Sequence, residues 1–266
     1  MTIKFLDQDP IVVSRRKLVQ GLAAGSIVAV AGCARNQAIG RDQLLLVSEG
    51  QIAQMAASSW TQIKRQTKIS QDRTLNRRLN TVGNKIVQTA GLQRQPWEFT
   101  VFDDDQANAF VLPGGKVGFY KGIFKRMKND DHLATVMGHE VGHVTAKHAA
   151  ERYSQQVAAG VVTTAAAVAL EAGDVRGGAQ IGGILGLGVQ FGILLPYSRR
   201  HELEADRLGV NYMHRAGYDA RQAIPFWDNM SAQRTGSPPP EFMSTHPSDA
   251  TRKAAIRQEL QRLGLA

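Results

Sequence analysis

The pentad His139-Glu140-Val141-Gly142-His143 has the HExxH pattern. Residues four apart lie on one face of an α-helix, so His139 and His143 would present two imidazole nitrogens to one point. Two imidazoles that converge in this way favour a zinc site. Glu140 would project about a quarter turn away from His139, which makes it a candidate general base and not a ligand. The less specific alternative is a helix with two unrelated histidines and a salt-bridging glutamate.

A helix must hold this pentad. We expect it to start at an N-cap on Asp130 and to continue to Gln156, because no proline interrupts that stretch. Gly138 and Gly142 lie inside the predicted helix, where a glycine costs about 1 kcal/mol relative to alanine. These two glycines are easiest to explain if another element packs closely against the helix.

A second helix is predicted to start at Pro196-Tyr197-Ser198 and to end near Gly217. A hydrolytic zinc site with two histidines needs a third protein ligand, and a carboxylate from a separate helix is a standard choice. Glu202 and Asp206 are four residues apart and share a face, whereas Glu204 points elsewhere. Asp206 then fits as the acceptor for the free N–H of a ligating histidine. An acidic surface patch is the alternative.

Residues 97 to 120 show a different period, because apolar and polar side chains alternate and Pro113-Gly114-Gly115 interrupts them as a turn. We predict three short antiparallel strands that lead into the HExxH helix. An extended peptide can pair with the free edge of such a sheet, so that backbone hydrogen bonds hold a scissile carbonyl over the metal. Asn108-Ala109-Phe110 is the expected edge, and a plain hairpin is the alternative.

The rest of the chain is predicted to be mainly helical. Caps and apolar spacing indicate four more helices. The first starts at a capping box of Ser48 with Gln51 and runs to about Thr67, and the second is closed by Gly91. The other two cover 219–233 and 248–263. The apolar runs 157–170 and 179–195 predict a helical hairpin packed on the core, or else a mobile lid or a flap that touches the membrane. The expected fold class is therefore α+β, mainly helical, with a small antiparallel sheet beside the HExxH helix.

The composition is that of a globular protein. At 266 residues, with 43% hydrophobic and 21% charged residues, the chain is long enough for one main domain. Its net charge of +9 favours anionic surfaces such as lipid headgroups. No recognition motif for nucleic acid accompanies this charge, so no nucleic-acid partner is expected. A single cysteine excludes an internal disulfide.

Residues 1–33 have the features of an export signal, because Ser14-Arg15-Arg16-Lys17 precedes a short apolar run. That run is too short and too rich in glycine for a membrane span, which needs about 20 apolar residues. Val30-Ala31-Gly32-Cys33 resembles the bacterial lipobox, so Cys33 is the predicted lipid anchor and 34–266 the single mature domain. The paired arginines also resemble a twin-arginine signal. A buried cysteine at the end of an uncleaved helix is the alternative.

Taken together, these segments resemble the zinc metallopeptidase family of the heat-shock protease HtpX, the CAAX prenyl protease and the outer-membrane assembly protease BepA. Four segments match in family order: Asn108-Ala109-Phe110 with Pro113-Gly114-Gly115, His139 to His143, Ser198-Arg199 through Glu202 to Asp206, and His246-Pro247 with Arg252. The resemblance implies a zincin-like fold that holds one zinc ion, with His139, His143 and Glu202 as ligands, Glu140 as base and Asp206 behind the ligands. It also places His246 and Arg252 near the substrate or the metal.

Two roles remain open for His246. It could donate to the tetrahedral oxyanion, or it could reach the zinc as a fourth ligand and keep the enzyme latent until its loop moves. Family members that span the membrane several times, or that carry a helical-repeat domain, differ from this chain. It looks like the short, single-domain lipoprotein members, for which prenylated substrates are not expected.

The expected function is a zinc endopeptidase, anchored at the bacterial envelope through Cys33, that cleaves misfolded or unassembled proteins there. Ala34 follows the cysteine in place of an aspartate, which implies the periplasmic face of the outer membrane in a Gram-negative cell. The strongest rival is a chaperone or assembly factor that grips extended chains along the Asn108 edge, with a site silenced by His246. A structural zinc lipoprotein is less favoured, since closed structural sites prefer cysteine to glutamate. No oligomeric state is predicted.

Overall fold

The computed structural model describes residues 32–171, 197–231, 241–246 and 250–265. In chain order its elements are β1 (Cys33–Asn36), β2 (Arg41–Leu44), α2 (Glu49–Gln66), α3 (Arg73–Thr89), β3 (Glu98–Phe102), β4 (Ala109–Leu112), β5 (Lys116–Tyr120), α4 (Lys121–Phe124), α5 (Asp130–Thr145), α6 (His148–Glu171), α8 (Arg199–Arg215), η2 (Ala220–Gln222), α9 (Ala223–Ser231), α10 (Glu241–Thr245) and α11 (Ala250–Arg262). The expected α+β class, mainly helical, is confirmed.

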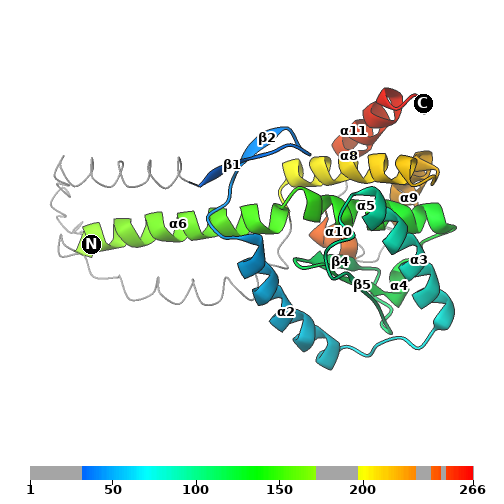
Figure 1. Cartoon of the computed structure of the whole chain (residues 1–266), viewed down its shortest axis with the longest axis horizontal. Helices are drawn as coiled ribbons and strands as arrows, with labels where there is room; N and C mark the ends of the chain where they lie inside the picture. The colour runs from blue at the N-terminus through cyan, green and yellow to red at the C-terminus, as the bar shows by residue number, and fades with distance from the viewer. Residues whose placement is uncertain (1–31, 172–196, 232–240, 247–249, 266) are drawn as a thin grey trace, which may run out of the picture.

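Helix α5, which carries the pentad, lies at the centre of the fold. The elements α3, β4, α8 and α9 pack around it, and α11 packs on α8 (Figure 1). Every residue of α5 from His132 to His143 is buried, so the helix is enclosed by its neighbours. Helix α6 extends away from this body (Figure 1). Within the described ranges, no helix combines the length and the apolar character that a membrane span requires.

The predicted starts of α2 and α5 differ in outcome. The capping box at the start of α2 is confirmed, because Gln51 N–H donates to the Ser48 hydroxyl and Ser48 N–H donates to the Gln51 side chain. The N-cap of α5 is Asn129 and not Asp130, since the Asn129 side chain accepts from His132 N–H. Asp130 instead begins the helix, where a negative charge stabilises the helix N-terminus.

The pentad helix is shorter than the sequence predicts. The prediction is one helix as far as Gln156, whereas α5 ends at Thr145 and α6 begins at His148. Lys147 has a φ of 54°, a left-handed conformation through which a right-handed helix cannot continue. The apolar residues 157–170 belong to α6, and the second apolar run, 179–195, lies outside the described residues.

The three-stranded sheet has the order β3-β5-β4. Strands β4 and β5 pair antiparallel around Pro113-Gly114-Gly115, where the two glycines have φ values of 82° and 75°. Strands β3 and β5 pair in parallel, which corrects the expectation of three antiparallel strands. Because β5 inserts between the two earlier strands, β4 lies at the edge, as predicted for Asn108-Ala109-Phe110. In a simple antiparallel meander, β4 would have been the central strand.

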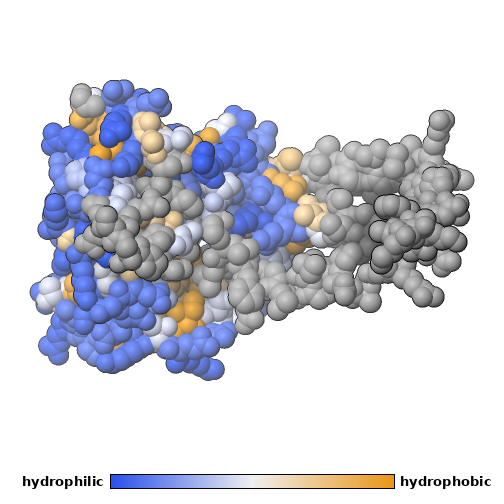
Figure 2. Space-filling model, turned by 180° about the vertical axis from the view of Figure 1, so that it is seen from behind, coloured by the Kyte–Doolittle hydropathy of each residue, from blue (hydrophilic) through white to orange (hydrophobic). Residues whose placement is uncertain are grey.

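The core is continuous from α3 through the sheet to α9. Leu79, Val82 and Ile86, spaced on α3 as the apolar pattern predicts, are at most 1% exposed. Trp227 and Phe226 of α9 fill the far side and are also at most 1% exposed. Charged and polar side chains cover most of the face shown in Figure 2, where apolar patches are small. The buried apolar area of the described residues therefore lies around α5.

Helices α5 and α8 approach each other at small residues. A Cβ added to Gly142 would lie 2.7 Å from the carbonyl oxygen of Ala205, and one added to Gly138 would lie 2.9 Å from that of Gly209. A Cβ on Gly209 would in turn lie 2.8 Å from the backbone nitrogen of His139. The expected reason for the two glycines of α5, close packing by another element, is thus found on α8.

This contact predicts that Gly142→Ala destabilises the protein although alanine is the better helix former. The added Cβ meets backbone atoms of α8, which cannot rotate away, and such overpacking costs typically ~1–3 kcal/mol. Thermal unfolding followed by circular dichroism should show a lower Tm, by roughly 2–4 °C for each kcal/mol. Gly50→Ala in the first turn of α2 is the matched control, because nothing lies within 4 Å of its added Cβ. An unchanged Tm in Gly142→Ala would contradict the close approach.

Candidate metal centre

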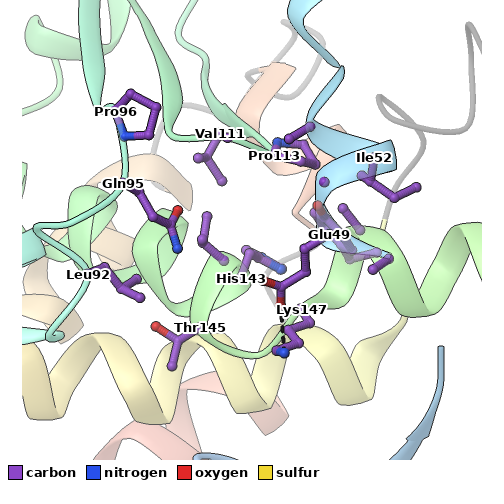
Figure 3. Close-up of a pocket in the computed structure, with 17 residues that line it drawn as sticks. Glu49, Ile52, Leu92, Gln95, Pro96, Val111, Pro113, His143, Thr145 and Lys147 are labelled. Atoms are coloured by element: carbon purple, nitrogen blue, oxygen red, sulfur yellow. Dashed lines mark ion pairs between the residues drawn. The ribbon is translucent and has the colours of Figure 1, made fainter. Parts of the chain in front are cut away.

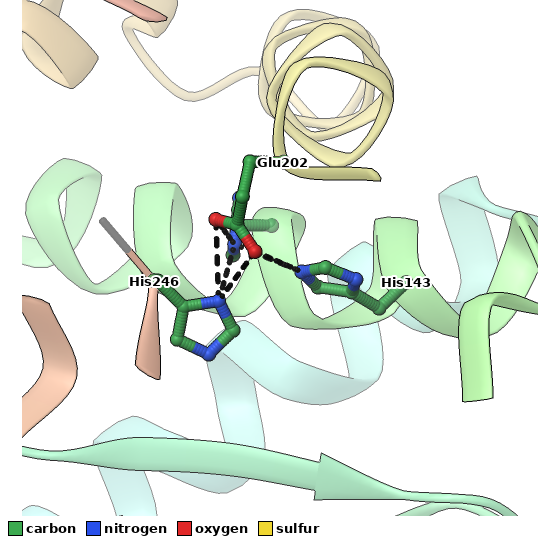
Figure 4. A group of neighbouring side chains, drawn as sticks. His143, Glu202 and His246 are labelled. Atoms are coloured by element: carbon green, nitrogen blue, oxygen red, sulfur yellow. Dashed lines mark hydrogen bonds and ion pairs between the residues drawn. The ribbon is translucent and has the colours of Figure 1, made fainter. Parts of the chain in front are cut away.

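Four side chains from three segments point to one spot (Figure 4). His139 and His143 come from α5, Glu202 comes from the first turn of α8, and His246 follows α10. One ligand atom of each lies within 4.8 Å of the others, and none of the four residues is more than 4% exposed. Nε2 of His139 lies 3.1 Å from Nε2 of His143 and 3.1 Å from Nδ1 of His246.

Glu202 faces both histidines of the pentad. Its Oε2 lies 3.3 Å from Nε2 of His139, and its Oε1 lies 3.5 Å from Nε2 of His143. Burial by itself raises the pKa of this carboxyl, but the neighbouring His246 and Arg252 hold the pKa of Glu202 well below its usual range. Glu202 is therefore an anionic oxygen donor directed at the two imidazoles.

Asp206 orients His139 from the other side of the ring. Its Oδ1 lies 2.8 Å from Nδ1 of His139, and the carboxylate accepts two hydrogen bonds of 2.7 Å from Arg252. Nδ1 of His139 therefore carries the proton, and Nε2 faces the cluster. Burial lowers the pKa of His139, but Glu202 and Asp206 outweigh it and raise the pKa to about 9. The cluster thus favours one further positive charge, which a proton or a metal cation can supply.

Arg252 lies behind the cluster and joins its parts. Its NH1 lies 2.8 Å from Oε2 of Glu202 and donates to the carbonyl of His246 at 3.1 Å, besides the two bonds to Asp206. The guanidinium lies 4.3 Å from the ring centroid of Trp227, and the residue is 1% exposed. The structure therefore places Arg252 beside the expected metal position, where it holds the carboxylates in place.

His143 is held by hydrogen bonds that the sequence does not predict. Its Nδ1 lies 2.9 Å from Nδ1 of His148, whose Nε2 lies 2.9 Å from Oε2 of Glu204. Burial lowers the pKa of His148 to about 4, so this ring is neutral at neutral pH. Its one proton lies on Nε2, opposite the carboxylate, so its Nδ1 accepts a hydrogen bond from Nδ1–H of His143. Nε2 of His143 is then left with a lone pair that faces the cluster.

The β1–β2 hairpin completes this network. Arg41 donates to both oxygens of Glu204, at 2.6 and 2.8 Å, and to both oxygens of Glu151, at 2.7 and 2.8 Å. Burial raises the pKa of Glu204, but the hydrogen bonds from Arg41 and His148 outweigh it and lower the pKa to about 2. Gln43 also donates to Glu151. Two strands outside the central body thus contact the residues that orient a candidate metal ligand.

Glu140 is buried beside the cluster, with one oxygen unused. It is 1% exposed, and its Oε1 has no hydrogen-bond partner among the described residues. Nε2 of His246 lies 3.5 Å from this same oxygen. Burial raises the pKa of Glu140 above that of an ordinary glutamate, toward the range useful for proton transfer near neutral pH. This geometry suits a general base.

The donor set fits a zinc ion. Two imidazole nitrogens present lone pairs, because Asp206 and His148 hold the protons on the opposite nitrogens, and Glu202 adds a carboxylate. Three such ligands with a fourth position left open are typical of hydrolytic zinc sites. His246 supplies a fourth nitrogen to the same cluster, so the described side chains can also close the site.

The free edge of β4 lies beside α5, next to the cluster. Tyr120 N–H donates to the carbonyl of Asn108, so by antiparallel alternation the backbone groups of Ala109 and Val111 point away from β5. On this side Ala109 N–H donates to the Asn108 side chain, and Val111 N–H donates to the Glu140 carboxylate. The Phe110 side chain points elsewhere, because its ring packs against Trp60 at 6.1 Å between centroids. Of the predicted substrate-binding residues, Ala109 therefore turns its backbone groups to the open side of β4, whereas the backbone groups of Asn108 and Phe110 face β5.

The residues of the turn after β4 have two different surroundings. Pro113 and Gly114 border a cavity next to His143. Gly115 instead packs under Trp97, where an added Cβ would lie 3.1 Å from the ring. Pro113 and Gly114 thus remain candidates for substrate contact, whereas the contacts of Gly115 explain it as a structural residue of the hairpin.

Four residues of this site are not found from the sequence. His148, Glu204 and Arg41 come from three segments, and the spacing within each segment gives no sign that they meet. Tyr197 stacks on the ring of His143, at 3.9 Å and 21°. The sequence gives a local hint for two of these residues, because His148 follows the pentad closely and Glu204 lies between Glu202 and Asp206.

We predict that Arg41→Ala weakens metal binding although Arg41 does not touch the cluster. Without its two pairs of hydrogen bonds, the Glu204 and Glu151 carboxylates lose their counter-charge, and His148 loses its fixed partner. Loss of such indirect support typically costs ~10–100-fold in metal affinity. Chelator competition for zinc measures it. Arg35→Ala, on the same hairpin but 63% exposed, is the control. Equal zinc affinity in both variants would show that the hairpin does not orient the ligand.

Comparison with known proteins agrees with this geometry. Residues 73–260 match the family model of peptidase family M48. The chain is 37% identical over 183 residues to the mitochondrial metalloendopeptidase OMA1 of Schizosaccharomyces pombe, covering 68% of this chain and 52% of that protein. It is 30% identical over 222 residues to the beta-barrel assembly-enhancing protease of Escherichia coli, covering 82% and 45%. The chain spans about half the length of these relatives. Since the family model matches more than half of its residues, the chain belongs to peptidase family M48.

Proposed function

We propose that this protein is a zinc metalloendopeptidase of the bacterial cell envelope that cleaves misfolded or unassembled proteins. The observation that carries this proposal is the convergence of His139, His143 and Glu202 on one point, with the carboxylate of Glu140 buried beside it, 3.5 Å from His246. Membership of peptidase family M48 supports it, as do relatives named as metalloendopeptidases and as proteases that enhance assembly of β-barrels.

The chemistry follows from the residues present. His139, His143 and Glu202 would hold the zinc ion, which when bound supplies Lewis-acid polarisation of the peptide carbonyl and of water. Glu140 takes the proton of the attacking water and returns it to the leaving amine. The edge of β4 holds the substrate as an additional strand through backbone hydrogen bonds. Asp206 keeps His139 in the tautomer that the zinc ion needs.

His246 acts in this proposal as a fourth ligand that keeps the enzyme latent. Its Nδ1 lies 3.1 Å from both Nε2 of His139 and Oε1 of Glu202, among the other ligand atoms. The alternative, donation to the oxyanion, requires the ring to leave these contacts and to face the substrate. The three residues that follow His246, 247–249, lie outside the described part of the chain.

Attachment to the membrane is proposed through Cys33. Cys33 is exposed at the start of β1. Residues 1–33 would hold the signal peptide and its lipobox, and cleavage before Cys33 would leave the lipidated cysteine as the first residue of the mature chain. Several acyl chains would then hold the peptidase domain 34–266 firmly on the periplasmic face of the outer membrane. The lipobox-like sequence supports this position, and so do the bacterial relatives named for assembly of β-barrels.

Glu140→Gln is predicted to abolish cleavage while zinc stays bound, because the base is lost but all ligands remain. The measurement is digestion of casein, an unfolded protein, by the purified chain, with zinc content determined on each sample. Loss of several orders of magnitude in rate would agree with a base that acts in the chemical step. If wild type binds zinc stoichiometrically and cuts nothing, the rival function, an assembly factor that only grips extended chains, gains instead.

His246→Ala is predicted to increase the rate of casein cleavage, since the fourth position becomes open without a change of the loop. The zinc content should remain near one ion per chain, because three ligands are left. A fall in rate at unchanged zinc content would assign His246 to the oxyanion. His214→Ala, on α8 and exposed, is the control for loss of a histidine elsewhere.

A further inference from the structure

A cavity of about 420 Å³ lies directly beside the metal cluster (Figure 3). It is bordered on one side by His143 and Val144 of α5 and on another by Val111 at the end of the β4 edge. The first turns of α2 and the segment 92–96 close it. The cavity thus shares one wall with the candidate metal centre and another with the strand on which the substrate would lie.

The interior of the cavity is apolar. Its walls include Ile52, Leu92, Val111, Pro113, Val144 and Ala150. The charged residues Glu49 and Lys147 also border it, but they form an ion pair with each other at 2.7 Å and are about half exposed (Figure 3). Because these two charges satisfy one another toward solvent, the cavity offers no unpaired charge of its own to a substrate.

A substrate strand over the cluster must pass this cavity. A peptide that pairs with the free edge of β4 runs along Ala109 and Val111, and its successive side chains point to opposite faces. The wall formed by Val111 and the wall formed by His143 belong to one cavity, so a side chain that leaves the strand near the metal on this face enters it. Its occupant is therefore a residue close to the cleaved bond.

We propose that this cavity binds a large apolar side chain of the substrate, such as leucine, methionine or phenylalanine, at one fixed position near the scissile bond. The inference rests on the proposed peptidase function and adds a rule of substrate choice. Folded proteins bury such side chains, whereas unfolded chains expose them. A protease that requires one at the cleaved bond thereby selects unfolded polypeptides, without a separate domain for recognition.

The first test maps every bond that the wild-type chain cuts in casein, by mass spectrometry. Large apolar residues are expected at one constant position relative to the cut. Peptides with leucine or alanine at that position should then differ in kcat/KM by about tenfold or more, since even one methylene in an apolar pocket is worth ~10-fold. No apolar enrichment at any position, with cleavage intact, would overturn the proposal.

Gln95→Trp tests the cavity itself. Gln95 is half-buried and reaches into the cavity from the segment 92–96 (Figure 3), so a tryptophan there reduces the space for a large side chain. The leucine-to-alanine ratio of kcat/KM should fall toward one, while cleavage of the alanine peptide persists. Gln93→Trp is the matched control, because Gln93 is exposed and does not border the cavity. Equal ratios in both variants would refute the assignment.

A measurement of peptide binding tests the cavity independently of the peptidase function. Fluorescence anisotropy of labelled leucine and alanine peptides on Glu140→Gln reports affinity without turnover. Tighter binding of the leucine peptide, reduced by Gln95→Trp in the same background, supports the cavity even if no variant cleaves anything. Equal binding of the two peptides counts against the cavity even if wild type proves to be an active peptidase.

Discussion

The site depends on how closely two helices approach each other. Gly138 and Gly142 of α5 meet Gly209 and Ala205 of α8 with backbone against backbone, and no side chain larger than a methyl group separates them. Each glycine in these helix interiors is unfavourable by about 1 kcal/mol relative to alanine, but a larger residue would not fit at the contact. The short distance between the helices allows the carboxylates of α8, one turn apart, to reach the imidazoles of α5. A wider separation would leave two histidines without an anionic partner.

Each histidine of the pentad is oriented from behind by a carboxylate that an arginine holds, His139 directly and His143 through the ring of His148. The two series are His139 with Asp206 and Arg252, and His143 with His148, Glu204 and Arg41. The charges in them are largely or wholly buried, and a buried ion pair is weak evidence for stability because desolvation offsets the attraction. Their effect is on geometry, since each series assigns one proton and leaves one nitrogen lone pair facing the cluster. The ligands are thus arranged before any cation arrives.

Strand order links this centre to substrate binding. Because β5 lies between β3 and β4, the backbone of β4 faces outward next to α5. The apolar cavity continues from that edge to the ring of His143. Edge, cluster and cavity therefore form one continuous surface, along which an extended chain can be held by its backbone and selected by one side chain. Such a surface suits a protease for unfolded proteins better than one for a single folded partner.

The HExxH pentad, the acidic helix and the capping box of α2 follow from the sequence alone, because each rests on spacing within one segment, and the family follows from the order of four such segments. His139 and His143, or Glu202 and Asp206, share a face through helix periodicity, which is a local property. Strand order, the break at Lys147, and the contacts of Arg41, His148 and Glu204 depend on segments far apart in the chain. No period within a segment records which distant neighbour fills the space beside it. Packing of the folded chain decided these features, and with them the tautomer of each histidine and the cavity at the edge.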